Sequence, residues 1–143
     1  MDLQALYSQR FPDQNLAHKN AIWKVICSRF LARYIKPTDT VVDVGAGYCE
    51  FINNIDCARK IAVDLTPDVR RFANPNVEVL NESCTAIKTL SPGSVDVVFM
   101  SNFLEHLPSK QLILETFHEA HRVLKPNGQI NGRRPKTRGV KGE

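Results

Sequence analysis

A glycine turn flanked by acidic residues is the part of this sequence best suited to bind a ligand. Gly45 and Gly47 follow a valine-rich segment at residues 41–44, in which Asp43 lies two residues before the first glycine. Glycine lets the backbone approach a ligand closely and adopt dihedral angles that other residues avoid. The free N–H groups of a helix beginning just after the turn would point to the same place. The pattern therefore predicts a ligand site that includes Asp43, Gly45, Ala46 and Gly47.

The acidic residues narrow the kind of ligand. A dinucleotide fingerprint requires glycine at the third position of G-x-G-x-x-G, where this chain has Glu50. A carboxylate at that position would repel a pyrophosphate, whereas an ammonium and a ribose suit Asp43 and Glu50. S-adenosylmethionine carries those groups and no phosphate. Two alternatives stay open: a nicotinamide dinucleotide, and a glycine turn that only links a strand to a helix.

The elements that must position this turn alternate between apolar strands and helices. Strands are expected at residues 40–44, 60–64, 76–80 and 95–101, and helices at 49–56 and 109–124. A fifth strand is expected at Gln129-Ile130 and to stop almost at once. This alternation is typical of a parallel sheet covered by helices on both faces, with ligands at the carboxyl ends of the strands.

Two helices have apolar spacing that predicts which side is buried. Between residues 16 and 35 the expected buried stripe consists of Trp23, Ile26, Cys27, Phe30 and Tyr34. In the long helix the expected apolar face holds Ile113, Phe117, Ala120 and Leu124. The opposite, solvated face then holds Glu115, His118, Glu119 and Arg122. No metal site is predicted there, although Glu115 and His118 have the spacing of a carboxylate–histidine pair.

Four segments, in this order and spacing, resemble class I S-adenosylmethionine-dependent methyltransferases. They are D-V-G-A-G at 43–47, A-V-D-L at 62–65, S-V-D-V-V-F-M-S-N-F-L-E-H-L at 94–107 and R-V-L-K-P-N-G at 122–128. The resemblance covers about residues 40–130. It implies an α/β, Rossmann-like three-layer sandwich with a mainly parallel sheet. It also implies S-adenosyl-L-methionine as cofactor, and we expect methyl transfer to a small-molecule acceptor.

The resemblance implies roles for residues on the first two strands. Gly45, Ala46 and Gly47 would lie against the methionine part of the cofactor, and Asp43 would hold that part through water or the amino group. Asp64, 19 residues after Gly45, would accept hydrogen bonds from both ribose hydroxyls. A helix cap for the turn at residues 66–68 is the alternative role for Asp64.

The resemblance also implies roles for residues at or after the ends of the second, third and fourth expected strands. Leu65 would pack on the adenine, and Ser83 or the backbone of Cys84 would serve where the family often has an acid near the adenine amino group. Ser101 and Asn102 would contact the amino-acid end or the ribose side of the cofactor. His106 would take a proton from the acceptor, and packing of the loop is its alternative role.

The composition and charge of the chain indicate which kinds of binding partner to expect. The 143-residue chain is 43% hydrophobic and 24% charged, and its net charge of +4 resides in residues 131–143, which hold five bases and Glu143. We therefore expect a cofactor-binding domain at 1–130 and a basic, disordered tail at 131–143. Nucleic-acid binding is not expected beyond a weak, salt-sensitive attachment of that tail.

The end of the chain differs from the family pattern. Class I methyltransferases usually continue after the fifth strand with a helix and an antiparallel pair of strands. This chain therefore resembles a member truncated at its C-terminus, with impaired catalysis as the expected consequence. Missing strands would leave a sheet edge that could pair with a second copy. The corresponding alternative function is a non-catalytic binding or oligomerising module.

The compartment is predicted from the cysteines and the N-terminus. The four cysteines form no CxxC pair, so they are expected to be reduced thiols. The sequence also has no secretory signal and no apolar run of about 20 residues that would span a membrane. These features predict a cytoplasmic protein.

Overall fold

The chain folds around one parallel sheet. The computed structural model describes residues 13–101 and 103–133. Its strands are β1 (Thr40–Val44), β2 (Arg59–Val63), β3 (Val77–Leu80), β4 (Val95–Ser101) and β5 (Leu124–Arg133). They lie in the order β3-β2-β1-β4-β5, and every neighbouring pair is parallel. The predicted α/β, Rossmann-like sandwich with a mainly parallel sheet is confirmed.

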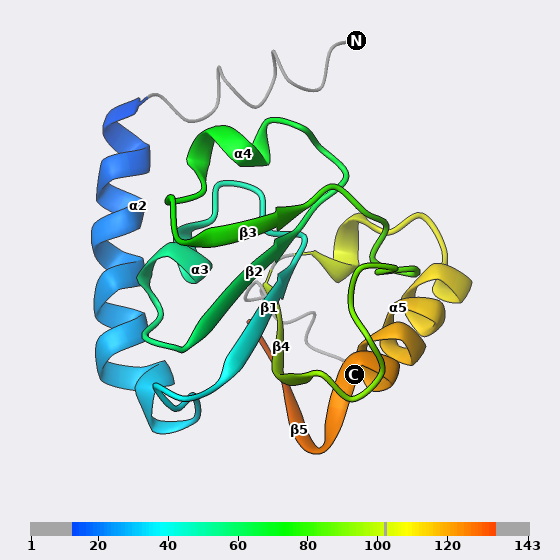
Figure 1. Cartoon of the computed structure of the whole chain (residues 1–143). Coiled ribbons are helices and arrows are strands. Elements are labelled where there is room, and N and C mark those ends of the chain that lie inside the picture. Colours follow the sequence, from blue (N-terminus) through cyan, green and yellow to red (C-terminus); the bar gives the residue numbers. More distant parts are fainter. Residues whose placement is uncertain (1–12, 102, 134–143) are drawn as a thin grey trace, which may run out of the picture.

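Helices cover the sheet on both sides, with α2 and α3 along one side and α5 along the other (Figure 1). The α-helices are α2 (Asp13–Val25), α3 (Glu50–Asn54), α4 (Val69–Phe72) and α5 (Lys110–Val123). Three further helical turns, one π and two 3-10, are η1 (Ile26–Phe30), η2 (Leu31–Arg33) and η3 (Leu104–His106). No helix within the described ranges is long and apolar enough to cross a membrane.

Side chains of the central strands alternate between two cores. On β1, Val41 joins the core under α2 and α3, whereas Val42 joins the core under α5. An aromatic cluster fills the first core: the rings of Phe51 and Phe99 stack at 3.6 Å, and Trp23 packs edge-on against both. Asp43 lies two residues after Val41 on β1, so its side chain points to the same face of the sheet, the face that carries the aromatic cluster.

The helical segment before β1 buries a different stripe from the one predicted. α2 passes directly into a π-helical turn, η1, whose i→i+5 hydrogen bonds shift the helix face by one residue. Beyond Cys27, the buried side is therefore continued by Leu31 and Ile35. Phe30 and Tyr34, predicted to be buried, are 55% and 51% exposed, and their rings pack on each other.

The predicted faces of α5 are partly wrong. Phe117 is exposed, and Glu119 is buried although we expected it in solvent. One Glu119 oxygen accepts the N–H of Ile87 at 2.8 Å, and the carboxylate also pairs with Arg122. The Arg122 guanidinium donates to the carbonyls of Ile87 and Leu90 as well. The hydrogen bond from Arg122 holds the pKa of Glu119 below its usual range, and the pair fastens the loop after β3 to α5.

β5 is longer than its sequence indicates. A strand ending at Ile130 is wrong, because residues 131–133 pair with Phe99, Met100 and Ser101 of β4. A Cβ on Gly132 would lie 2.5 Å from the carbonyl oxygen of Met100, so only glycine allows this close approach. The expected tail therefore begins inside the sheet, and residues 134–143 lie outside the described part. β5 forms one edge of the described sheet, and its pairing with a second copy stays a prediction.

Candidate functional site

The turn between β1 and α3 has the backbone that its glycines were predicted to allow. Gly45 and Gly47 have φ angles of +73° and +53°, in the left-handed region. The N–H groups of Gly45 and Ala46 donate to the carbonyl of Val63 on β2, at 2.8 and 3.3 Å. Cys49, just before α3, is also left-handed with φ +59°. Burial raises the pKa of its thiol to about 12, so Cys49 is a packing residue and not a nucleophile.

Phe103, from the loop after β4, lies directly against Gly45. A Cβ placed on Gly45 would meet Cδ2 of the Phe103 ring at 2.2 Å and Cγ at 2.6 Å, whereas a Cβ on Gly47 would meet nothing within 4 Å. Gly45 is therefore required both by its φ angle and by its neighbour. Gly47 is required by its φ angle alone.

Asp64 lies just beyond β2 and ties the turn to the next loop. Its Oδ2 accepts the N–H of Gly47 at 3.0 Å, and its Oδ1 accepts the N–H of Thr66 at 2.8 Å. The second of these bonds is the local turn role that the sequence left as an alternative. Each carboxylate oxygen has a further lone pair, so a ribose diol could bind to the same group. The hydrogen bonds fix Asp64 at the carboxyl end of β2, beside the glycine turn.

Three carboxylates gather at this turn. Asp43 is 4% exposed, and burial raises its pKa to about 8, with a further contribution from the negative charges of Asp64 and Glu50. Burial also raises the pKa of Glu50, an effect that the nearby Lys19 ammonium opposes. The Oε1 atom of Glu50 is buried without a hydrogen-bond partner. Such a site attracts a cation and disfavours the pyrophosphate of a dinucleotide.

The loop after β4 reaches the same edge of the sheet. Ser101 is the last residue of β4, and its hydroxyl is buried and unpartnered. Asn102 lies outside the described residues. The His106 side chain is 63% exposed, and its Nε2 lies 3.9 Å from a carboxylate oxygen of Glu105. The structure thus places Ser101 at the predicted site and His106 in the solvent-facing turn η3.

The predicted adenine contacts lie on the loops that follow β2 and β3. Leu65 is 69% exposed, so its side chain is free to pack on a flat ligand. The hydroxyl of Ser83 already pairs with the hydroxyl of Thr85 at 2.9 Å. The Cys84 thiol turns toward α5, where it lies 3.3 Å from Oγ1 of Thr116. The roles of Leu65, Ser83 and Cys84 toward an adenine stay predictions.

Asn131 is a polar residue of this region that the sequence reasoning missed. It pairs with Phe99 of β4, and Phe99 in turn pairs with Asp43 of β1. Its Nδ2 atom is buried and has no hydrogen-bond partner. Residues 129–133 carry little apolar character, so only the backbone pairing with β4 reveals that Asn131 belongs to the sheet.

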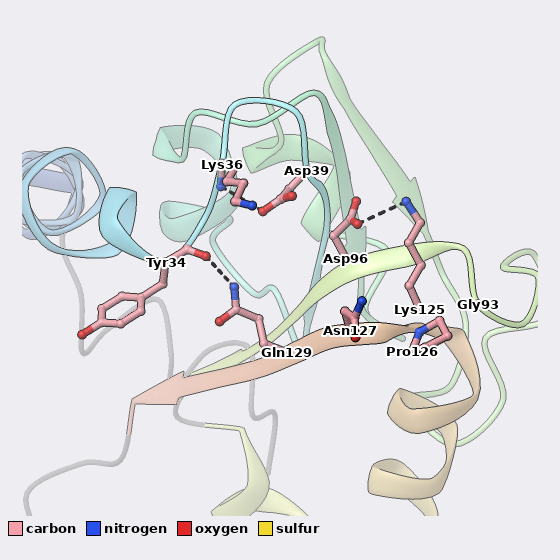
Figure 2. Close-up of a pocket in the computed structure, with 9 residues that line it drawn as sticks. All are labelled: Tyr34, Lys36, Asp39, Gly93, Asp96, Lys125, Pro126, Asn127 and Gln129. Carbon is pink, nitrogen blue, oxygen red and sulfur yellow. Dashed lines mark hydrogen bonds and ion pairs between the residues drawn. The ribbon is translucent and has the colours of Figure 1, made fainter.

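A hollow of about 500 Å³ opens at the opposite end of the sheet from the glycine turn (Figure 2). Asp96 in its wall accepts the N–H of Thr40 at 2.8 Å and pairs with Lys125 at 3.1 Å. Asp39 accepts the N–H of Lys36 at 2.8 Å. These carboxylates fix the amino ends of the strands, whereas ligands of open parallel sheets bind at the carboxyl ends. The hollow is therefore separate from the site at the glycine turn.

Fold and site together define a class of protein: an α/β domain with an acid-flanked glycine turn at the carboxyl ends of β1 and β2. A family model described as "Methyltransferase domain" matches residues 42–131. The matched range begins in β1, includes the glycine turn and Asp64, and ends in β5. The chain belongs to this methyltransferase domain family.

Individual relatives share this architecture. The chain is 26% identical to a probable methyltransferase, ltbC, from Aspergillus luteorubrus, over 85% of this chain and 49% of the relative. It is similar to a SAM-dependent methyltransferase from Archaeoglobus fulgidus (24% identity, TM-score 0.67, 90% of this chain and 57% of that one). It is also similar to a possible histamine N-methyltransferase from Thermotoga maritima (19%, TM-score 0.65, 86% and 57%). The chain thus spans about half the length of the curated relative, and the solved structures show the shared fold.

Proposed function

We propose that the chain binds S-adenosyl-L-methionine at the turn between β1 and α3 and serves methyl transfer to a small-molecule acceptor. The observation that carries this proposal is the gathering of Asp43, Glu50 and Asp64 around a left-handed glycine turn. Membership in the methyltransferase domain family supports the reaction class.

The residues present fit this cofactor. The unpartnered Oε1 of Glu50 and the buried Asp43 suit an ammonium group. Asp64 is held where it can accept from a ribose diol, and the exposed Leu65 offers an apolar face for the adenine. When bound, S-adenosylmethionine supplies an electrophilic methyl group on a sulfonium.

The contribution of the chain to the reaction is mainly alignment. Holding two reactants in line can supply about 7–11 kcal/mol of rate enhancement, so a general base is not essential for a good nucleophile. Where the acceptor must lose a proton, His106 is the proposed group to take it, because it lies in the loop that leaves β4 at this edge.

A small-molecule acceptor is supported by two observations. One structural neighbour is described as a possible histamine N-methyltransferase, and histamine is a small amine. Residues 1–130 carry equal numbers of bases and acids, so this part of the chain lacks the basic field expected for a nucleic-acid acceptor.

The proposal is tested by the change Asp64→Ala. Loss of a charged hydrogen-bond acceptor for the ribose should weaken binding of S-adenosylhomocysteine by about 10–100-fold, since such bonds contribute about 1.5–3 kcal/mol. The measurement is isothermal titration calorimetry on the full chain, with thermal melting to establish that each variant is folded.

Asp39→Ala is the matched control. Asp39 also accepts a backbone N–H in a turn, but at the other end of the sheet, so its loss should leave affinity unchanged. Equal affinity of the Asp64→Ala variant and the unmodified chain would contradict the proposed site.

A further inference from the structure

Two polar side chains on β4 and β5 have buried atoms without partners. These are the hydroxyl of Ser101 and the Nδ2 of Asn131. Asn131 pairs with Phe99, two residues before Ser101 on β4. Because side chains alternate along a strand, Ser101 and Asn131 lie on the same face of neighbouring strands. Gln129, on that face of β5, donates to the carbonyl of Tyr34, so the face is the one covered by the helical segment before β1.

The two groups lie on the face of the sheet to which Asp43, just before the glycine turn, also points. Asp43, Phe99 and Asn131 form one row across β1, β4 and β5. Strands are about 4.8 Å apart, so Asp43 and Asn131 are separated by about 10 Å between Cα atoms. Ser101 lies on the strand between them, beyond Phe99 and toward the open end. Because the Phe99 ring fills the row between Asp43 and Asn131, a ligand group that reaches from the turn toward β5 would pass Phe99 on the side of Ser101.

Buried donors without partners indicate that the ligand group must carry hydrogen-bond acceptors. An unsatisfied buried donor costs about 1–3 kcal/mol, and few such groups occur in native proteins. The Nδ2 of an asparagine only donates, so its partner must be an acceptor atom. The Ser101 hydroxyl can donate to the same acceptor group.

The charges at the turn decide which end of the cofactor lies there. The amino-acid head of S-adenosylmethionine carries an ammonium and a carboxylate. Asp43 and Glu50 at the turn attract the ammonium and repel the carboxylate. The carboxylate is therefore directed away from β1 and α3, toward the uncharged donors on β4 and β5.

We infer that Ser101 and Asn131 bind the α-carboxylate of the cofactor, with Asn131 as a positioning residue contributed by β5. This inference rests on the proposed function, and it adds a residue to the site that lies outside the glycine turn. The uncharged donors lie on β4 and β5, whereas the acids Asp43 and Glu50 lie at the glycine turn. The site therefore matches the charges of the amino-acid head in one orientation only. That orientation extends the methionine chain across β4.

The test compares two ligands that differ in the amino-acid head. S-adenosylhomocysteine has the head, whereas 5′-methylthioadenosine lacks it. Asn131→Asp keeps the side-chain shape and places a carboxylate opposite the ligand carboxylate. We expect calorimetry on the full chain to show at least about tenfold weaker binding of S-adenosylhomocysteine, equivalent to about 1.4 kcal/mol. Binding of 5′-methylthioadenosine should stay within about twofold.

Two further variants sharpen the result. Ser101→Ala should weaken S-adenosylhomocysteine binding by about threefold to tenfold, again without effect on 5′-methylthioadenosine. Asn127→Asp makes the same chemical change on β5, at the hollow of Figure 2, and should leave both affinities unchanged.

Three outcomes separate the possibilities. Loss of affinity for S-adenosylhomocysteine alone supports the inference. An equal loss for both ligands would show that Asn131 only supports the fold, and an unchanged affinity for both would show that it faces no carboxylate; either result overturns the inference. If the unmodified chain binds neither ligand, the proposed function itself fails.

Discussion

Gly45→Ala is expected to lower the free energy of unfolding by about 2–5 kcal/mol. A left-handed conformation costs a non-glycine residue about 1–2 kcal/mol, and overpacking costs about 1–3 kcal/mol more. The second cost arises because the new Cβ would lie 2.2 Å from Cδ2 of Phe103. Urea denaturation of the full chain measures the change. Cofactor affinity should fall as well, because the turn must move to make room for the alanine side chain.

Gly47→Ala is the matched control for this change. Gly47 shares the positive φ but has open space where a Cβ would go, so only the conformational cost of about 1–2 kcal/mol applies. Adding Phe103→Ala to Gly45→Ala should remove the clash, so the two changes together should cost less than the sum of their separate effects. Equal losses for the two glycine variants would show that Phe103 does not press on the turn.

Asp43→Asn is expected to stabilise the fold at about pH 8 while weakening cofactor binding. The folded-state pKa of Asp43 is about 8 against an ordinary value of 3.8. Between these values the folded chain binds more protons than the unfolded chain, so this group makes stability fall as pH rises. The amide cannot ionise, so the pH dependence of stability due to Asp43 should disappear in the variant. Its free energy of unfolding at about pH 8 should rise by about 5 kcal/mol, at about 1.4 kcal/mol per unit of pKa.

Binding should respond to pH in the opposite direction. The cofactor ammonium favours the ionised form of Asp43, so affinity for S-adenosylhomocysteine should rise between about pH 6 and about pH 7.5. Calorimetry in two buffers of different ionisation enthalpy should detect proton release. Asp43→Asn should bind at least about tenfold more weakly, without proton release, while Asp39→Asn should behave like the unmodified chain. A variant that binds as tightly as the unmodified chain would rule out contact between Asp43 and the ammonium.

Local patterns suffice for the first four strands but not for β5 or the helix faces. The β-branched runs and the turns between them predict β1 to β4, because strands buried on both faces leave a clear apolar signal. The burial of Leu31 in place of Phe30 depends on a π-helical turn, which the spacing of apolar residues does not reveal. Burial of Glu119 depends on Ile87 and Arg122, and the contact with Ile87 exists only in the folded chain.

The candidate site also contains some features that local sequence patterns predict and others that only the fold reveals. The glycine turn and Asp64 follow from residue types and spacing, and the structure joins them through the hydrogen bond from Gly47 to Asp64. The contact between Phe103 and Gly45 joins the loops after β4 and β1, so no local pattern predicts it. Asn131 was assigned to the tail because its neighbours are polar, yet pairing with β4 places it in the sheet.

The most direct test of the central claim is a calorimetric titration of the full 143-residue chain with S-adenosylhomocysteine, alongside the same titration with NADH. Three carboxylates around the glycine turn should admit the nucleoside with its ammonium and exclude the pyrophosphate. The expected result is saturable one-to-one binding of S-adenosylhomocysteine and no binding of NADH. An absence of heat with millimolar S-adenosylhomocysteine, or equal binding of NADH, would contradict a cofactor site at the turn between β1 and α3.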